Sequence, residues 1–505
     1  MPIENLRQLY QKIIERYRDF SLLTSIESLL FWDQQTMMPP AGVEIRGLQR
    51  SLTERFKHRI IRSRELGNLL KEILAHPDFS SLTQVEQRNI ELIQRMHREA
   101  VAVPEKLISE IKRQETTTVS KWLIAKKRGD FKVVEKELGR LIELNRELSR
   151  LLMDEKEVST LYDALIDIYE PKVSTEVIDP LFSQVGGRLR MLIDRYESEE
   201  NFFTSKEMDV ERQRELVLKV ASFLGYRFDG ESAWGRIDIS EHPFTSGKYN
   251  DVRVTVHYRP GDFTYALFSA LHECGHALYD HNLPEEWFFT PVGEPCSYGI
   301  HESQSRFVEN IVGRSPEFWR YLISILDKLT NGKVNSDVLP EILREVNRVR
   351  RGKIRLEADE ATYGLHIIIR YNVEKELFNG DLKVSELPSV WEEQYSEYLD
   401  VEVSDDREGV LQDIHWYIGA FGYFPTYLLG NLYSTIMLQV INRECKGWRN
   451  ELEEGSLIRV LNWLKNNIHQ MGKLYDPLVL IQRIGGKVSH QPYIQYLEDK
   501  YKGLF

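Results

Sequence analysis

The chain has 505 residues, of which 42% are hydrophobic and 29% charged, a composition typical of a folded globular protein. Its formal net charge of −12 disfavours non-specific binding to nucleic acid or to an anionic membrane surface. No apolar run of about 18 residues is present, so we expect no transmembrane helix. The N-terminus lacks the apolar core of a secretory signal, and three cysteines form no disulfide framework, so we expect a cytoplasmic protein.

Residues 1–230 predict a succession of amphipathic helices. Apolar side chains recur three and four positions apart, which places them on one face of a helix. Prolines and glycines separate these stretches, as expected for the turns between helices. The apolar stretches are Leu6-Leu9-Ile13, Leu52-Phe56-Ile60, Ile90-Leu92-Ile93 and Leu138-Leu141-Leu144-Leu148, and the breaks are Pro39-Pro40, Pro77, Pro104, Gly129 and Pro171.

Residues 234–258 differ, because glycines and β-branched residues replace the helical pattern. Val252, Val254 and Val256 alternate with the polar residues of 251–257, which gives a strand with one apolar and one polar face. We interpret this region as an antiparallel sheet of two or three strands. Such a strand can hold a substrate backbone by edge pairing, and a purely structural hairpin explains the pattern equally well.

Residues 272–276 read His-Glu-Cys-Gly-His and lie in a helix that we expect over about 262–282. Histidines four positions apart project from one face of a helix, where a single Zn²⁺ can bind both. Glu273 lies beside that position and can take a proton from a water molecule on the metal. H-E-x-x-H on a helix is the signature of zinc metallopeptidases, whereas two core histidines with an incidental glutamate are the alternative.

A catalytic zinc ion takes three protein ligands and keeps one position open. The extended metzincin pattern requires glycine and histidine where this chain has Tyr279 and Asn282, so the third ligand must come from elsewhere. Glu302 is our choice, because it opens a predicted amphipathic helix over 300–312. Asp280 is a candidate to support the metal ligands from behind. Cys274 points about 200° away from His272 on the helix, so we expect it to pack in the core.

Two later segments carry further candidates. Residues 354–366 predict a helix on which Arg355 could bind the terminal carboxylate of a substrate, although an exposed ion pair with Asp359 is the simpler interpretation. In a glycine-rich aromatic stretch, His415 and Tyr423 could donate hydrogen bonds to the oxyanion of peptide hydrolysis, although core packing would also explain them.

No Gly-rich, Ser-rich or Pro-rich linker divides the chain, so we expect one domain over residues 1–505. Its helical N-terminal part ends near residue 230, the sheet covers about 234–258, and helices continue from the metal-binding helix to residue 505. The fold class that we expect is mainly α, with the metal-binding helix lining a groove between two lobes.

Several blocks of the chain, in order, resemble the carboxypeptidase Taq family of zinc metallocarboxypeptidases. The resemblance runs over most of the sequence, and no metal or base position departs from it. The blocks are Phe31-Trp-Asp-Gln-Gln-Thr-Met-Met-Pro-Pro40, His242-Pro-Phe244, Asp251-x-Arg253-x-Thr255, His272-Glu273-x-x-His276, His301-Glu302-Ser303-Gln304, Ile354-Arg355-x-x-Ala358-Asp359, Gly409-x-x-Gln412-Asp413-x-His415-Trp416, Tyr475-Asp-Pro477 and Gly485-Gly486.

The resemblance implies a mostly helical fold with a deep groove, a sheet of about three strands and a homodimer. It implies zinc on His272, His276 and Glu302, replaceable by cobalt, with Glu273 as the general base. The implied reaction removes single C-terminal residues from peptides, with broad side-chain tolerance and poor action next to proline. With Arg355, the block residues Arg253 and His242 are candidate substrate-binding residues.

Two rival functions remain at this point. The same zinc helix could serve an oligopeptidase or a dipeptidyl carboxypeptidase, which cut elsewhere in the peptide. Alternatively, the chain could be an inactive helical scaffold that binds peptides and keeps zinc only for its structure, although an intact Glu273 argues against this.

Overall fold

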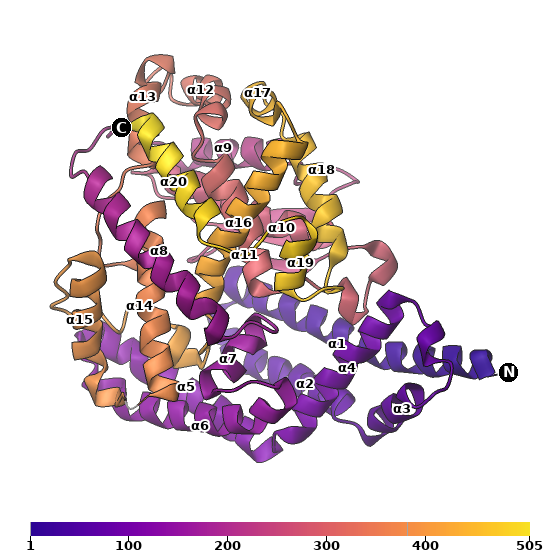
Figure 1. The fold of residues 1–505 in the computed structure, drawn as a ribbon. Helices are drawn as coiled ribbons and strands as arrows, with labels where there is room; N and C mark the ends of the chain where they lie inside the picture. The colour runs from indigo at the N-terminus through magenta and orange to yellow at the C-terminus, as the bar shows by residue number, and fades with distance from the viewer. Residues whose placement is uncertain (1, 381) are drawn as a thin grey trace.

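The computed structural model describes residues 2–380 and 382–505, and it is mainly helical with one small sheet (Figure 1). The N-terminal helices are α1 (Pro2–Thr36), α2 (Val43–Ile61), α3 (Arg64–Leu74), α4 (Gln84–Ala102), α5 (Glu105–Arg128), α6 (Lys132–Lys156), α7 (Leu161–Tyr169), α8 (Thr175–Tyr196) and α9 (Val210–Phe223). After the sheet follow α10 (Phe263–His281), α11 (Tyr298–Arg306), α12 (Pro316–Leu329), α13 (Leu339–Val346), α14 (Glu360–Asn379), α15 (Leu387–Leu399), α16 (Pro425–Glu444), α17 (Trp448–Glu453), α18 (Ile458–Asn467), α19 (Pro477–Arg483) and α20 (Gln491–Leu504).

Several helices begin or end at residues that satisfy the free backbone groups of a helix terminus, and the predicted turn at Gly129 is confirmed. Thr83 and Glu86 form a reciprocal capping box that begins α4, so two backbone N–H groups without helical partners are satisfied. Gly129 ends α5 in the left-handed conformation that favours glycine. Among the described residues, no helix is long and apolar enough to cross a membrane.

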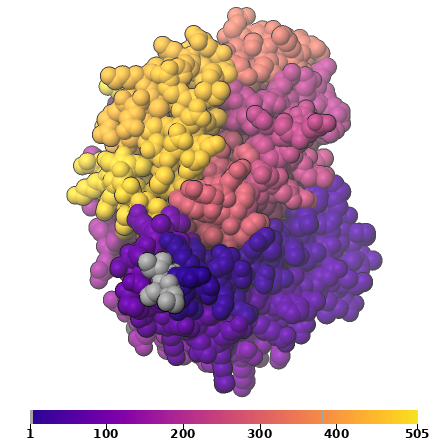
Figure 2. All heavy atoms as spheres, turned by 90° about the vertical axis from the view of Figure 1, so that its right-hand side faces the viewer, coloured from indigo at the N-terminus to yellow at the C-terminus, as the bar shows by residue number. Residues whose placement is uncertain are grey.

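Two separate clusters of buried apolar side chains account for two lobes. The smaller cluster joins α1, the end of α2 at Ile61, α3 and α4 through residues such as Leu9, Leu70 and Ile93. The larger cluster runs from Val103 to Tyr501 and unites the remaining helices with the sheet. Figure 2 shows the N-terminal residues, in indigo and purple, forming the lower part of the molecule beneath the central and C-terminal segments.

The sheet has three strands, β1 (Gly235–Ile239), β2 (Thr245–Lys248) and β3 (Asp251–Val256), in the order β1-β3-β2. β2 and β3 are antiparallel, but β1 pairs with β3 in parallel. The expectation of a purely antiparallel sheet was therefore wrong, because side-chain alternation sets the faces of a strand and not the direction of its neighbour. Thr255, expected on a polar face, is buried and bonds to Ser240 Oγ at 2.7 Å.

A groove with a cavity volume of about 1920 Å³ separates the lobes. One wall comes from α1, and β2 lies along the groove as an edge strand. The opposite side is formed by α10, α11 and the segment 345–359. Figure 1 shows α10, α11 and α16 at the centre of the fold, where the larger core surrounds them.

Candidate active site

The site is built where α11 lies between α10 and α16, and two glycines allow the three helices to approach closely. A Cβ atom on Gly275 of α10 would lie 2.6 Å from Ser305 Cα, in the backbone of α11. A Cβ atom on Gly430 of α16 would lie 2.6 Å from Glu302 Cγ. Any side chain at either position would therefore push α11, and Glu302 with it, out of place.

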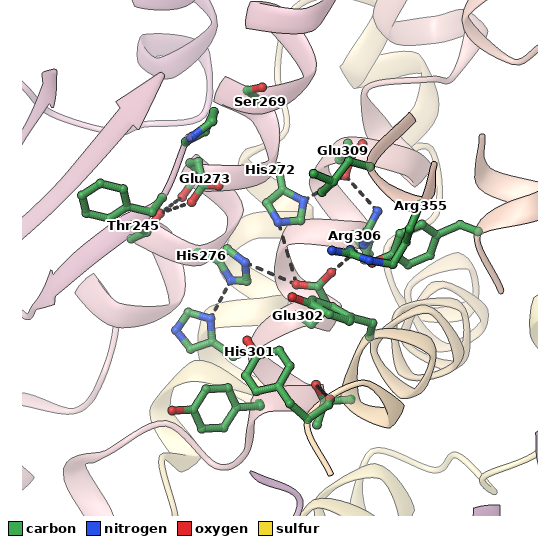
Figure 3. Close-up of a pocket in the computed structure, with 18 of the residues that line it drawn as sticks. Thr245, Ser269, His272, Glu273, His276, His301, Glu302, Arg306, Glu309 and Arg355 are labelled. Atoms are coloured by element: carbon green, nitrogen blue, oxygen red, sulfur yellow. Dashed lines mark hydrogen bonds and ion pairs between the residues drawn. The ribbon is translucent and has the colours of Figure 1, made fainter. Parts of the chain in front are cut away.

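The close packing brings the three predicted ligands together, as Figure 3 shows. Ligand atoms of His272, His276 and Glu302 all lie within 4.8 Å of one another. Glu302 Oε2 is 3.4 Å from His276 Nε2 and 3.8 Å from His272 Nε2. Ligands on a tetrahedral zinc ion with bonds of about 2.0–2.1 Å are about 3.3 Å apart, so the three residues fit a zinc ion with little movement.

Two of the three candidate ligands, His272 and Glu302, are held from behind by other side chains. His272 Nδ1 lies 2.9 Å from Glu309 Oε2, and Arg306 Nε donates to Glu302 Oε1 at 2.6 Å. Arg306 thus occupies one oxygen of Glu302 and leaves the other facing the histidines. Burial alone would raise the pKa of Glu302, but the Arg306 guanidinium and His272 outweigh it and hold that pKa well below its usual range.

Glu273 is buried beside the triad, and β2 fixes its orientation. Thr245 Oγ1 donates to Glu273 Oε2 at 2.7 Å and also lies 2.9 Å from the Glu273 carbonyl oxygen. Burial raises the pKa of Glu273, against the opposing effect of His272. A carboxylate whose proton affinity is increased in this way is suited to act as a general base.

Arg355 lies in a short turn, η7 (Arg355–Glu357), and not in the predicted helix, because α14 begins only after Asp359 caps it. Its Nε and Nη2 donate to Asp413 Oδ1 at 2.9 and 2.7 Å. The other Asp413 oxygen accepts from the fully buried Arg370 at 2.7 Å. One carboxylate thus serves two guanidinium groups, which leaves a net positive charge beside the groove that Arg355 lines.

Tyr423 lines the groove, as expected of a residue near the reacting atoms. Its ring packs edge-on against Tyr298 and Tyr427, which also line the groove. His415 is not among the groove-lining side chains of the described residues. It lies behind Tyr427, with Nε2 3.1 Å from the Tyr427 hydroxyl, and burial together with Arg355 lowers its pKa to about 3.

The family model for carboxypeptidase Taq (M32) metallopeptidases matches residues 12–501. This chain belongs to that family. Thermostable carboxypeptidase 1 of Thermus thermophilus is 35% identical, over 98% of this chain and 99% of the relative. Carboxypeptidase 1 of Bacillus subtilis is 34% identical over all of both chains. The M32 carboxypeptidase structure from Deinococcus radiodurans R1 has a TM-score of 0.92 and 29% identity, covering 98% of this chain and 99% of that one.

Membership of the M32 family makes the chain a metal-dependent peptide hydrolase of the carboxypeptidase type. It confirms the family resemblance of the sequence blocks, and M32 structures share its mainly helical fold.

Three candidate site residues are not among the described side chains that line the groove. Arg253 bonds to Asp251 and stacks over the Trp32 ring at 4.3 Å, so its guanidinium is already engaged. His242 is exposed outside the groove. His415 is separated from the groove by Tyr427. The sequence blocks indicate which segments lie near the groove, but they do not show which side of each segment faces it.

Several residues of the site escaped the sequence analysis. Glu309 follows Glu302 by seven positions, a helical spacing that could have indicated it. Thr245 gave no local signal, because only the fold brings β2 against α10. The run of basic residues in segment 348–355 was a further signal, because a cluster of cations suits a substrate that carries a carboxylate. Five cationic side chains of this segment line the groove: Arg348, Arg350, Arg351, Lys353 and Arg355.

The glycine contact gives a direct test of how Glu302 is placed. Gly430→Ala should weaken the binding of added zinc at least about tenfold, because the added methyl group displaces the candidate ligand Glu302. Gly187→Ala is the matched control, since Gly187 lies in α8 with no atom within 4 Å of its added Cβ. Chelator competition measures both affinities. Wild-type zinc affinity in Gly430→Ala would contradict the role given to this contact.

Proposed function

We propose that this protein is a zinc-dependent carboxypeptidase that releases single residues from the C-terminus of peptides, with broad side-chain tolerance. The observation that supports this most is the convergence of His272, His276 and Glu302, with Glu273 buried beside them in a groove. The groove is large enough for a peptide, and its edge strand β2 can pair with an extended backbone.

In the proposed reaction, His272, His276 and Glu302 would hold a zinc ion, which when bound would polarise the scissile carbonyl group and acidify a water molecule. Glu273 accepts the proton of the attacking water and then delivers it to the leaving amine. Thr245 keeps the Glu273 carboxylate in place by donating to its Oε2. To Tyr423, which lines the groove beside Tyr427, we assign the hydrogen bond to the oxygen that gains negative charge in the transition state.

The preference for the C-terminus is assigned to Arg355. Because Asp413 is shared with the buried Arg370, the positive charge of this cluster is not fully balanced, and Arg355 presents it to the groove. A free terminal carboxylate would restore that balance through a charge-assisted hydrogen bond. An internal peptide bond offers no such charge.

Digestion of an N-terminally blocked peptide tests the reaction. The product masses should decrease by one residue at a time from the C-terminus, since the anchor admits only the last peptide bond. Loss of dipeptides, or internal cleavage, would instead support an oligopeptidase or a dipeptidyl carboxypeptidase.

The matched control for that digestion is Glu273→Gln. This variant should bind zinc normally but lose at least about 10²-fold in rate, because the amide cannot accept the proton. Glu286→Gln, in an exposed turn, should digest peptides like the wild type. Full activity of Glu273→Gln with bound zinc would refute the base assignment.

The anchor is tested by comparing free-acid and amidated forms of one peptide. Arg355→Ala should lower kcat/KM for the free acid by about 10- to 100-fold and should affect the amidated peptide far less. Asp413 keeps Arg370 as its partner in this variant, so the fold should persist. Arg350→Ala removes a more exposed cation of the same segment and should discriminate less between the two peptides. Equal losses on both peptides would remove Arg355 from the role.

We further propose a homodimer in which the α1–α2 face is the interface. This face consists of seven apolar side chains that are 38–67% exposed: Leu22, Ile26 and Leu29 on α1, and Ile45, Leu48, Leu52 and Phe56 on α2. The helices run antiparallel and are joined by Glu27–Arg50 and Asp33–Arg46 pairs, so helical spacing directs both apolar rows to the same side. α2 alone is about 30 Å long. The two rows therefore offer an apolar area similar to the roughly 800 Å² per partner that stable interfaces bury.

Leu48→Glu should convert the dimer into a monomer, because it places a charge in the centre of this apolar face. Ile458→Glu is the control, since Ile458 is equally exposed but lies on α18, outside the α1–α2 face. Light scattering after gel filtration measures the mass of each. A dimeric Leu48→Glu variant, or a monomeric wild type, would contradict the proposed interface.

A further inference from the structure

The two candidate histidine ligands are supported in different ways. His272 Nδ1 meets a carboxylate directly, at Glu309 Oε2. His276 Nδ1 instead lies 2.5 Å from another imidazole nitrogen, His301 Nδ1. His301 Nε2 in turn lies 3.2 Å from Asp280 Oδ2. Figure 3 shows His301 beside His276, on the side away from Glu309.

This arrangement permits one consistent assignment of hydrogens. His276 directs Nε2 toward Glu302, so Nε2 must keep its lone pair for a metal and the ring hydrogen must lie on Nδ1. His301 Nδ1 then accepts that hydrogen, which places the hydrogen of His301 on Nε2. Asp280 has only acceptors and receives it. Every nitrogen and the carboxylate thus have a complementary partner.

The local packing holds His301 in this position. His301 precedes Glu302 on α11, and its ring packs on Tyr279 at a centroid distance of 5.2 Å. Asp280 follows His276 by one turn of α10 and is itself buried. Because His276 and Asp280 share a helix while His301 comes from its neighbour, the chain of contacts also depends on the spacing between α10 and α11.

We infer that His301 is a positioning residue that orients His276 for metal binding, with Asp280 fixing His301 in turn. This inference rests on the proposed zinc site, since it concerns one of its ligands. A residue that orients a metal-bound imidazole and fixes its tautomer strengthens metal binding without touching the metal. Glu309 accepts the Nδ1 hydrogen of His272 directly. For His276 the acceptor would be the His301 ring, which Asp280 holds in turn.

Zinc affinity of the metal-free protein, measured by competition with a chelator, tests the inference. His301→Leu should weaken zinc binding about 10- to 100-fold, because His276 Nδ1 loses its acceptor. His301→Asn should restore most of the affinity, since its amide oxygen can occupy the position of Nδ1. His242→Leu, which changes an exposed histidine outside the groove, should bind zinc like the wild type.

Two further measurements separate positioning from a merely structural role. The melting temperature of metal-free His301→Leu should equal that of the metal-free wild type, whereas a structural residue would lower it. The visible absorption spectrum of the cobalt-loaded protein should shift in His301→Leu and return toward the wild type in His301→Asn.

The outcomes also distinguish this inference from the proposed function. Unchanged zinc affinity in His301→Leu, or a lower melting temperature of its metal-free form, would overturn the role of His301 and leave the zinc site standing. Failure of the wild type to bind zinc would overturn the proposed function, and this inference with it.

Discussion

The site depends on one close contact: α11 packed between α10 and α16 at two glycines. Gly275 and Gly430 together place the backbone of α11 so near its neighbours that Glu302 reaches the histidines of α10. His272 and His276 are positioned by helical spacing alone, but a third candidate ligand from a different helix requires this tertiary approach. The geometry of the candidate metal site therefore depends on how tightly the core is packed.

The electrostatics follow from that packing. Two buried carboxylates, Glu273 and Glu302, and the partly buried Glu309 lie near the two histidines, and their mutual repulsion has to be balanced. Arg306 contacts both Glu302 and Glu309, so it balances the acids behind the ligands. Among the described residues, no arginine or lysine pairs with Glu273, which accepts from Thr245 instead, and burial leaves its pKa raised. The same buried region thus holds one acid firmly ionised and gives another a greater affinity for protons.

Much of this could be predicted from the sequence where a periodic pattern carried the information. The spacing of His272 and His276 indicated a shared helix face, and Glu302 followed from the helix that it opens. Sequence periodicity could not predict the features that depend on how segments far apart in the chain pack together. Alternation in β3 revealed its faces but not the parallel partner β1, and it could not show that Arg253 turns toward Trp32. Thr245 became visible only once β2 was placed against α10, and the contact of His301 with His276 only once α11 was placed there.

The groove lies between elements of two different cores, because α1 shares the smaller core with α2, α3 and α4. The candidate ligands and Glu273 all belong to elements of the larger core, whereas α1, which forms the facing wall, belongs to the smaller one. Polar contacts such as Arg88 to Asp476 and Asn89 to Val292 join the two cores. α1 also packs directly on β2, where Ser246 Oγ donates to the Ser28 carbonyl oxygen and Phe31 lies edge-on to the Phe244 ring. Because β2 also carries Thr245, which bonds to Glu273, a shift of this wall would be felt at the candidate base.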